Sequence, residues 1–136
     1  MIEIEELRVG NYVMYNNTVV QVWGIISPAP REDKRYGDGY LIEVFEGAST
    51  MTVKLEDVSA IDFDAEWAEK LKLKKVTWKE NIYNRYVIEH SHWFEVGRFP
   101  VSGGCIYIDD KQYKLFDFVH ELQNITYWIT KKELTL

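Results

Sequence analysis

The stretch that decides the fold of the first half covers residues 7–25 and reads Leu-Arg-Val-Gly-Asn-Tyr-Val-Met-Tyr-Asn-Asn-Thr-Val-Val-Gln-Val-Trp-Gly-Ile. Apolar residues alternate with other residues on both sides of Asn16 and Asn17, which is the period of a strand with one buried face. Asparagine tolerates the left-handed backbone of a tight turn. The stretch therefore predicts a hairpin whose second strand runs from residue 18 to residue 25.

The rest of residues 1–62 continues this pattern. Residues 27–39 hold two prolines, two glycines and several charged side chains, so they predict a long exposed loop. Residues 40–45 and 51–55 predict a second hairpin, and residues 55–61 a closing turn. Short strands, one long first loop and a terminal turn resemble the Src-homology type of small β-barrel. We expect its core to contain six apolar side chains: Val13, Val20, Val22, Ile42, Val44 and Val53.

Residues 63–136 predict an α+β region within the same compact unit, which places the whole chain in the α+β class. Asp64 is a good N-cap for a short helix that ends near Leu71, with Trp67 on its buried face. An antiparallel meander follows, with strands predicted at residues 75–79, 83–90, 93–99 and 104–108. A last helix is predicted from residue 115 or 117 to Thr130.

The last helix has the clearest periodicity in the chain. Its predicted packing face consists of Phe118, Leu122, Ile125 and Ile129. The opposite face carries polar and aromatic side chains: His120, Gln123, Asn124 and Tyr127. Two interpretations of this second face stay open, a contact surface for a partner and a half-buried second packing face.

Composition and charge limit the function classes. The chain has 136 residues and a net charge of -6, and residues 1–62 hold 11 acidic against five basic side chains. This balance argues against nucleic acid as a partner. Cys105 is the single cysteine, so an internal disulfide is excluded and an intracellular setting is favoured. The N-terminal residues lack a secretory signal pattern and no window resembles a membrane span, so we expect a cytoplasmic protein without membrane contact.

The C-terminal residues resemble a known group of proteins. Val119-His-Glu-Leu-Gln-Asn, followed by Thr130 and Glu133-Leu134, is similar to the ending of short uncharacterised proteins of gut bacteria and their phages. Residues 7–13 and the segment from Ala60 to Leu73 resemble other parts of the same proteins. The resemblance implies an accessory protein of a phage or mobile element, and it implies no activity. The chain differs from that family at Lys131-Lys132 and in the loop of residues 27–39.

Patterns that carry chemistry are weak. His90 and His92 are spaced to share one face of a strand, as two ligands of one metal ion would be, but no third ligand is identifiable. His120-Glu121 begins like a helical zinc-protease motif, but Asn124 stands where the second histidine is needed. Cys105 is more typical of the inner face of a strand than of a nucleophile. We therefore predict no catalytic residue, no metal and no cofactor.

Three hypotheses follow, in order of preference. The first is a non-enzymatic accessory or interaction protein that binds a host protein, with binding residues among His120, Gln123, Asn124 and Tyr127. The second is a small-ligand protein that binds or sequesters a nucleotide, through four residues of the loop: Arg31, Lys34, Arg35 and Tyr36. The third, a metal-dependent enzyme, ranks below both. Assembly into a homo-oligomer is compatible with each hypothesis.

Overall fold

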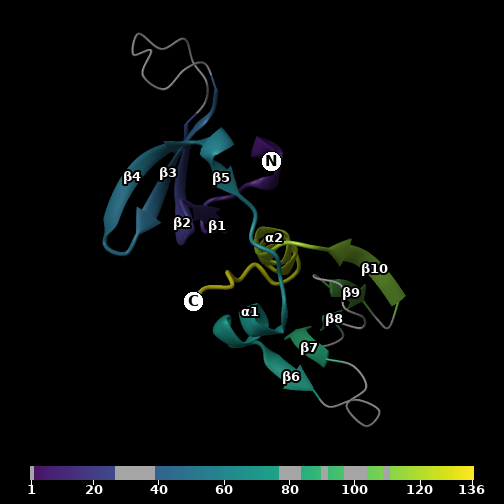
Figure 1. Ribbon diagram of the computed structural model, residues 1–136. Helices are drawn as coiled ribbons and strands as arrows, with labels where there is room; N and C mark the ends of the chain where they lie inside the picture. Colours follow the sequence, from purple (N-terminus) through teal and green to yellow (C-terminus); the bar gives the residue numbers. More distant parts are fainter. Residues whose placement is uncertain (1, 27–38, 77–83, 90–91, 97–103, 109–110) are drawn as a thin grey trace. The chain divides into compact units, whose positions relative to one another are not determined.

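The computed structural model shows an α+β protein, which confirms the predicted class (Figure 1). Its described residues contain two five-stranded antiparallel sheets and two α-helices. The chain divides into two units, unit 1 from Met1 to Ile61 and unit 2 from Asp62 to Leu136. The structure describes residues 2–26, 39–76, 84–89, 92–96, 104–108 and 111–136.

Unit 1 contains one sheet with the strand order β4-β3-β2-β1-β5. A 3-10 helix, η1 (Ile4–Glu6), precedes the sheet, and a second one, η3 (Leu55–Asp57), connects the last two strands. The strands are β1 (Tyr12–Tyr15), β2 (Thr18–Ile26), β3 (Leu41–Glu46), β4 (Ser49–Lys54) and β5 (Val58–Ser59). Both predicted hairpins are therefore present, as β1–β2 and β3–β4.

Two tight turns set the register of these hairpins. Asn16 and Asn17 have positive φ angles of 47° and 60° between the paired residues Tyr15 and Thr18. Positive φ at both central residues is the requirement of the type I′ turn, whose twist matches that of the strands. In the second hairpin Gly47 takes the positive φ, at 62°. The inner face then buries all six predicted core side chains, which lie in one cluster with Ile2, Leu7 and Val58.

The predicted closure of this sheet into a small barrel is wrong for the described residues. The sheet is open, with β4 at one edge and β5 at the other. Closure requires a continuous ladder between the two edge strands. The strand β5 has only two residues, Val58 and Ser59, and both pair with β1. The Src-homology type stays a prediction.

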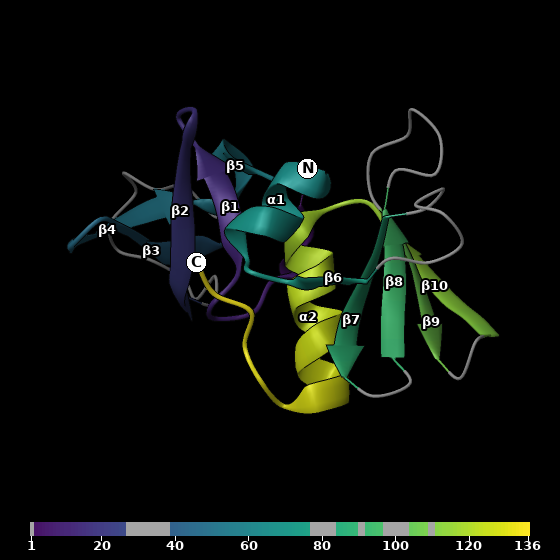
Figure 2. The same ribbon diagram turned by 90° about the horizontal axis from the view of Figure 1, so that it is seen from below.

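Unit 2 contains the second sheet, whose strands follow each other in the order β10-β9-β8-β7-β6, as the predicted meander requires. Figure 2 shows α2 lying beside this sheet, and it contacts β7. The elements are α1 (Ala65–Lys70), β6 (Lys74–Val76), β7 (Asn84–Glu89), β8 (His92–Val96), β9 (Gly104–Ile108), β10 (Lys111–Phe116) and α2 (Val119–Thr130). Its core includes Phe63 and Phe116, whose rings meet edge to face at 5.3 Å.

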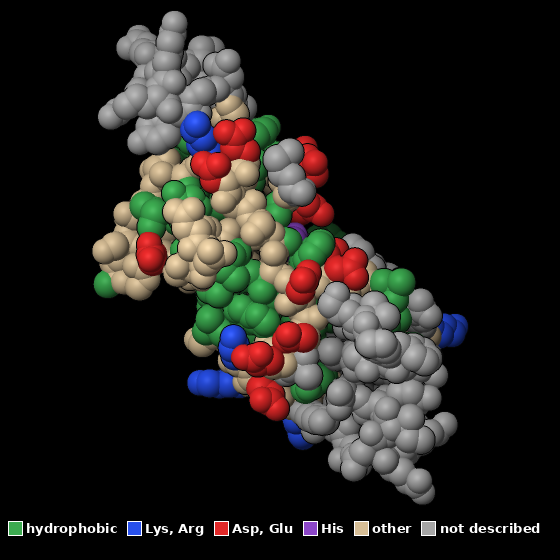
Figure 3. Space-filling model, in the orientation of Figure 1, with side chains coloured by type: hydrophobic (Ala, Val, Ile, Leu, Met, Phe, Trp, Pro, Cys, Tyr) green, Lys and Arg blue, Asp and Glu red, His purple; other side chains and the backbone are tan. Residues whose placement is uncertain are grey.

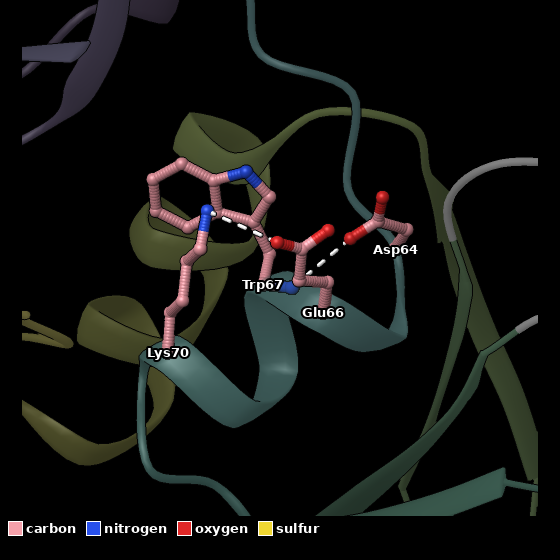
Figure 4. Close-up of polar contacts among 4 residues, drawn as sticks. All are labelled: Asp64, Glu66, Trp67 and Lys70. Carbon is pink, nitrogen blue, oxygen red and sulfur yellow. Dashed lines mark hydrogen bonds and ion pairs between the residues drawn. The ribbon is translucent and has the colours of Figure 1, made fainter.

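The short helix α1 begins as predicted, at Asp64. The backbone N–H of Trp67 donates to Asp64 Oδ1 at 3.0 Å, which satisfies one of the unpaired donors at the helix start. Lys70 lies 3.6 Å from Glu66 Oε1 and 5.0 Å from the ring centre of the buried Trp67 (Figure 4). The ammonium group of Lys70 thus lies over the Trp67 ring, and its ion pair with Glu66 is worth only about 0.5 kcal/mol at this exposed position.

The helix α2 has no favoured cap residue at either end. Its start is capped by a side chain of its own first turn, and its end by a backbone hydrogen bond. Glu121 Oε1 accepts hydrogen bonds from the N–H groups of Asp117 and Phe118, each at 3.2 Å. At the other end, Lys131 adopts the left-handed conformation, with φ 59°, and its N–H donates to Tyr127 O at 2.7 Å. Within the described residues, neither α1 nor α2 combines the length and the apolar character that a membrane crossing requires.

The first prediction concerns the β1–β2 turn. Asn17→Gly should raise the free energy of unfolding by about 0.5 kcal/mol, because glycine adopts a positive φ without the steric cost of a side chain. Asn17→Val should lower it by about 1–2 kcal/mol, because a branched side chain is strained in that conformation. Urea unfolding measures both changes. Thr18→Gly, in the adjoining strand, is the control and should destabilise; a loss of stability in Asn17→Gly would contradict the assigned turn.

The pKa of Tyr86 links stability to pH. This β7 residue is 3% exposed, and burial, followed by the Glu69 carboxylate of α1, raises the pKa of its hydroxyl. Both causes penalise the phenolate in the folded protein, whereas tyrosine in the unfolded chain ionises near pH 10. The stability that neutral Tyr86 contributes is complete below about pH 10 and is lost as the pH rises through the raised value.

We therefore expect Tyr86→Phe to unfold with a weaker pH dependence in alkaline solution. Its free energy of unfolding should fall less than that of the unchanged protein between pH 9 and about pH 11, because phenylalanine has no proton to lose. Glu69→Gln should give an intermediate slope, since it removes only the second cause. Urea unfolding at several pH values measures these slopes, and identical slopes in all three proteins would disprove the linkage.

Candidate functional site

The exposure of the polar face of α2 favours the second of its two interpretations at two of the four residues. His120 is 1% exposed and Gln123 is fully buried, so neither lies on an outward surface. Asn124 and Tyr127 are half-buried. His120 and Gln123 therefore belong to a second packing face of α2.

The buried side of α2 carries five residues: Val119, His120, Leu122, Gln123 and Thr126. Ile125 and Ile129, which were predicted to pack on the meander, are only half-buried. Successive residues of a helix differ by 100° in direction, so the buried side is turned from the predicted one by about one residue position. Apolar periodicity identified the helix but not the face that it buries, because two large polar residues occupy the buried side.

The buried polar side chains of α2 have structural contacts. Gln123 Nε2 donates to the backbone oxygen of Leu134 at 2.9 Å, which holds the C-terminal segment against the helix. The imidazole of His120 stacks on the ring of Phe118, with 5.8 Å between centres and 8° between planes. These contacts join the two ends of α2 to the chain around it. They assign Gln123 and His120 a role in folding.

The exposed end of α2 carries Trp128, which is 73% exposed. Lys131 Nζ lies 4.9 Å from the centre of the Trp128 ring and 5.8 Å from that of Tyr127. A lysine at this distance from an indole is a cation–π contact. One part of the Trp128 ring is therefore covered by a hydrated ammonium group.

Several predicted residues lie outside the part of the chain that the structure describes. These are the loop residues Arg31, Lys34, Arg35 and Tyr36, and also His90 of the histidine pair. Cys105 is half-buried on β9. Among the described residues no three His, Cys, Asp or Glu side chains are grouped closely enough to hold a metal ion.

A surface that sequence reasoning did not single out lies on the outer face of the unit 1 sheet. We call it the Trp23 surface, and it consists of Trp23, Glu43, Phe45, Thr50 and Thr52. Trp23 is 53% exposed, and its ring lies 4.7 Å from that of Phe45 at an angle of 57°. Thr50 and Thr52 are exposed opposite Phe45 and Glu43. The residues come from three adjacent strands.

A β-bulge in β2 places Trp23 on this face. Val22 pairs with Val44 and Gly24 pairs with Glu43, so Trp23 is the extra residue between them. Both residues of such a bulge oppose one residue of the partner strand. A Cβ atom on Gly24 would lie 3.4 Å from Glu43 Oε2, an ordinary contact distance, so Gly24 lies directly beside the Glu43 side chain. A glycine inside an apolar strand is the sequence signal that would have indicated the bulge.

The Trp23 surface lies in an acidic unit. The described residues of unit 1 include seven acidic side chains, Glu3, Glu5, Glu6, Glu43, Glu46, Glu56 and Asp57, against two basic ones, Arg8 and Lys54. Figure 3 shows the acidic side chains (red) at several separate places on unit 1. Lys54 Nζ lies 3.8 Å from Glu56 Oε1 and offsets that carboxylate. Among the described acidic residues of β3 and β4, Glu43 and Glu46 have no ion pair of this kind with Arg8 or Lys54.

The Gln123 contact generates a prediction about the C-terminal segment. Gln123→Met preserves side-chain length but cannot donate to Leu134 O, so the free energy of unfolding should fall by about 1–3 kcal/mol. Amide exchange of residues 131–136 should become faster. In a chain shortened by residues 134–136 the same substitution should cost less, because its acceptor is already gone. An equal cost in both chains would show that Leu134 is not the relevant partner.

Comparison with known proteins adds no relative. The chain matches no known protein family, no curated protein and no solved structure.

Proposed function

We propose that this protein is a non-enzymatic interaction protein that binds a host protein through the Trp23 surface of unit 1. The observation that carries the proposal is the exposed Trp23 ring, held against Phe45 on the outer face of an acidic sheet. The description as an accessory protein of a phage or mobile element is part of the proposal. It is supported only by the resemblance of residues 7–13, residues 60–73 and the C-terminal residues to that family.

The energetics of an exposed tryptophan support a binding role. Tryptophan and tyrosine are enriched among the residues that contribute most to protein interfaces. Burying the exposed half of an indole, roughly 100 Å², contributes about 2 kcal/mol at 25 cal/mol per Å². Because Trp23 already contacts Phe45, its side chain loses less conformational freedom on binding than an isolated one would.

Trp128 is more exposed than Trp23 but supports the proposal less. Its ring lies beside the Lys131 ammonium group, and a partner that covered the indole would also have to remove water from that charge. Trp23 has an aromatic neighbour instead. Trp128 therefore serves as the matched control for Trp23, since both are exposed tryptophans, one in each unit.

The nucleotide alternative has no support among the described residues. The side chains expected to contact phosphate, Arg31, Lys34 and Arg35, lie outside them. It stays a prediction, and a thermal-shift screen with nucleotides tests it. A ligand present at 100 times its dissociation constant would stabilise the protein by about 2.7 kcal/mol.

The proposed function predicts a Trp23-dependent interaction. The unchanged protein and Trp128→Thr should capture the same protein from the lysate of a gut bacterium, and Trp23→Thr should capture at least about tenfold less, as a lost interface anchor implies. Threonine suits a strand and Trp23 is half-exposed, so Trp23→Thr should remain folded. Quantitative mass spectrometry of the captured proteins makes the measurement.

Circular dichroism and urea unfolding check that both variants fold. Capture that is equal for all three proteins would contradict the role of the Trp23 surface. The absence of any captured protein above the resin background would contradict the proposed function itself.

A further inference from the structure

The outward backbone groups of the edge strand β4 are a feature of unit 1 that the proposed function does not use. This strand lies at the end of the sheet, and β3 is its one neighbour among the described strands. Ser49, Thr50 and Thr52 are exposed. An edge strand presents backbone donors and acceptors to solvent, and an additional strand can pair with them.

The register of the β3–β4 pair identifies which backbone groups point outward. The N–H of Leu55 donates to Tyr40 O at 3.0 Å, so these two residues form a hydrogen-bonded pair. Such pairs alternate along an antiparallel ladder with pairs that are not hydrogen-bonded. Val53, Met51 and Ser49 therefore bond to β3. The N–H and C=O groups of Thr50 and Thr52 are directed away from β3, toward the edge.

The other sheet protects its edges, and β4 does not. In unit 2 the edge strand β6 carries the exposed Lys74, and the edge strand β10 carries the exposed Lys111. Lysine on an edge strand discourages pairing with another chain. The strand β4 reads Ser-Thr-Met-Thr-Val-Lys, with one lysine at its last position and no proline. Its first five residues leave the edge open.

Charge identifies the kind of strand that fits this edge. Glu43 lies opposite Thr52 and Glu46 opposite Ser49, so each sheet face has one carboxylate beside this edge, with Glu43 on the outer face that it shares with Phe45. Adjacent strands are about 4.8 Å apart, so both carboxylates are within two strand spacings of an added strand. A second copy of this chain would bring its own acidic unit 1 to the edge. Repulsion therefore disfavours self-pairing, and a basic segment is favoured.

The short side chains of Thr50 and Thr52 also favour a basic added strand, because they leave space above β4 for long side chains. They stand between the edge and the larger residues Phe45 and Glu43 on the next strand. An arginine on an added strand could lie across a threonine, because its side chain is long and flexible. Its guanidinium group would then reach the Glu43 carboxylate or the Phe45 ring, which are the two partners that it prefers.

We propose that β4 accepts an extended, basic segment of the partner protein as an additional strand of the unit 1 sheet. The inference rests on the proposed function, since it specifies how the partner contacts the outer face. Backbone hydrogen bonds to Thr50 and Thr52 supply affinity, and basic side chains on the outer face, which is the face of Glu43, supply specificity. The partner chemistry is therefore an alternating segment with lysine or arginine at every second position.

The test uses the full chain and a fluorescein-labelled peptide, Arg-Val-Arg-Val-Arg-Val, at concentrations where the peptide is monomeric. Fluorescence anisotropy should show saturable binding of this peptide and none of Glu-Val-Glu-Val-Glu-Val. Affinity should fall about fivefold or more between 50 and 300 mM salt, because exposed charges contribute to it. Amide exchange at Thr50 and Thr52 should slow when the peptide is bound.

Variants of Thr52 distinguish the contribution of its backbone N–H to binding from that of its side chain. Thr52→Pro removes an outward N–H without removing a hydrogen bond to β3, and it should weaken binding at least about tenfold. Thr52→Val preserves that N–H and should lose much less affinity than Thr52→Pro. Thr52→Lys repels the basic peptide without any change to the backbone, so it gives a second answer if the proline variant fails to fold.

Several results would overturn the inference. They are a failure of the basic peptide to bind, equal binding of the acidic peptide, and unchanged binding by both Thr52→Pro and Thr52→Lys. A concentration-dependent dimer that Thr52→Pro abolishes would make a second copy of the chain the occupant and would also overturn it. If Trp23-dependent capture persists in a folded Thr52→Lys variant, the proposed function stands and the inference about β4 fails.

Discussion

Every exposed group of unit 1 depends on the burial of one face of its sheet. Side chains in a strand alternate between the faces, so a register slip of one residue would turn Val20 and Val22 to solvent. The two-residue turns after β1 and β3 hold the register by adopting positive φ at Asn16, Asn17 and Gly47. Because the valines must face inward, the residues between them must face outward. The composition of the outer face is therefore a consequence of the core.

Among the described strands of unit 1, this alternation changes at the bulge in β2. An extra residue in one strand shifts the phase of the side chains that follow it. Before the bulge, Val22 faces the core opposite Val44, and after it Ile25 pairs with Ile42. Because of the extra residue, the three steps from Val22 to Ile25 on β2 span the same length of ladder as the two steps from Val44 to Ile42 on β3. Trp23 occupies the extra position, where its bulky ring has space on the outer face.

The accuracy of sequence reasoning differed between strands and helices for a physical reason. Strand burial depends on a simple alternation and on turn residues, and both hairpins, the six core residues and the meander were predicted correctly. Barrel closure was not predictable, because it depends on the length of β5. The buried face of α2 was missed because Gln123 and His120 lie inside, where Gln123 donates to Leu134 and the His120 ring stacks on Phe118, and a helical pattern does not reveal such contacts.

The candidate site lies on unit 1, among residues that do not belong to any recognised sequence motif. Polar side chains on a helix suggested recognition, yet Gln123 binds the chain's own C-terminal segment. On the sheet, the carboxylates of Glu43 and Glu46 act on anything within about 8 Å, the screening length at physiological salt. Lys54 offsets Glu56 at the far end of β4. The attraction for a basic segment is consequently strongest along Ser49–Thr52, where the outward backbone groups also lie.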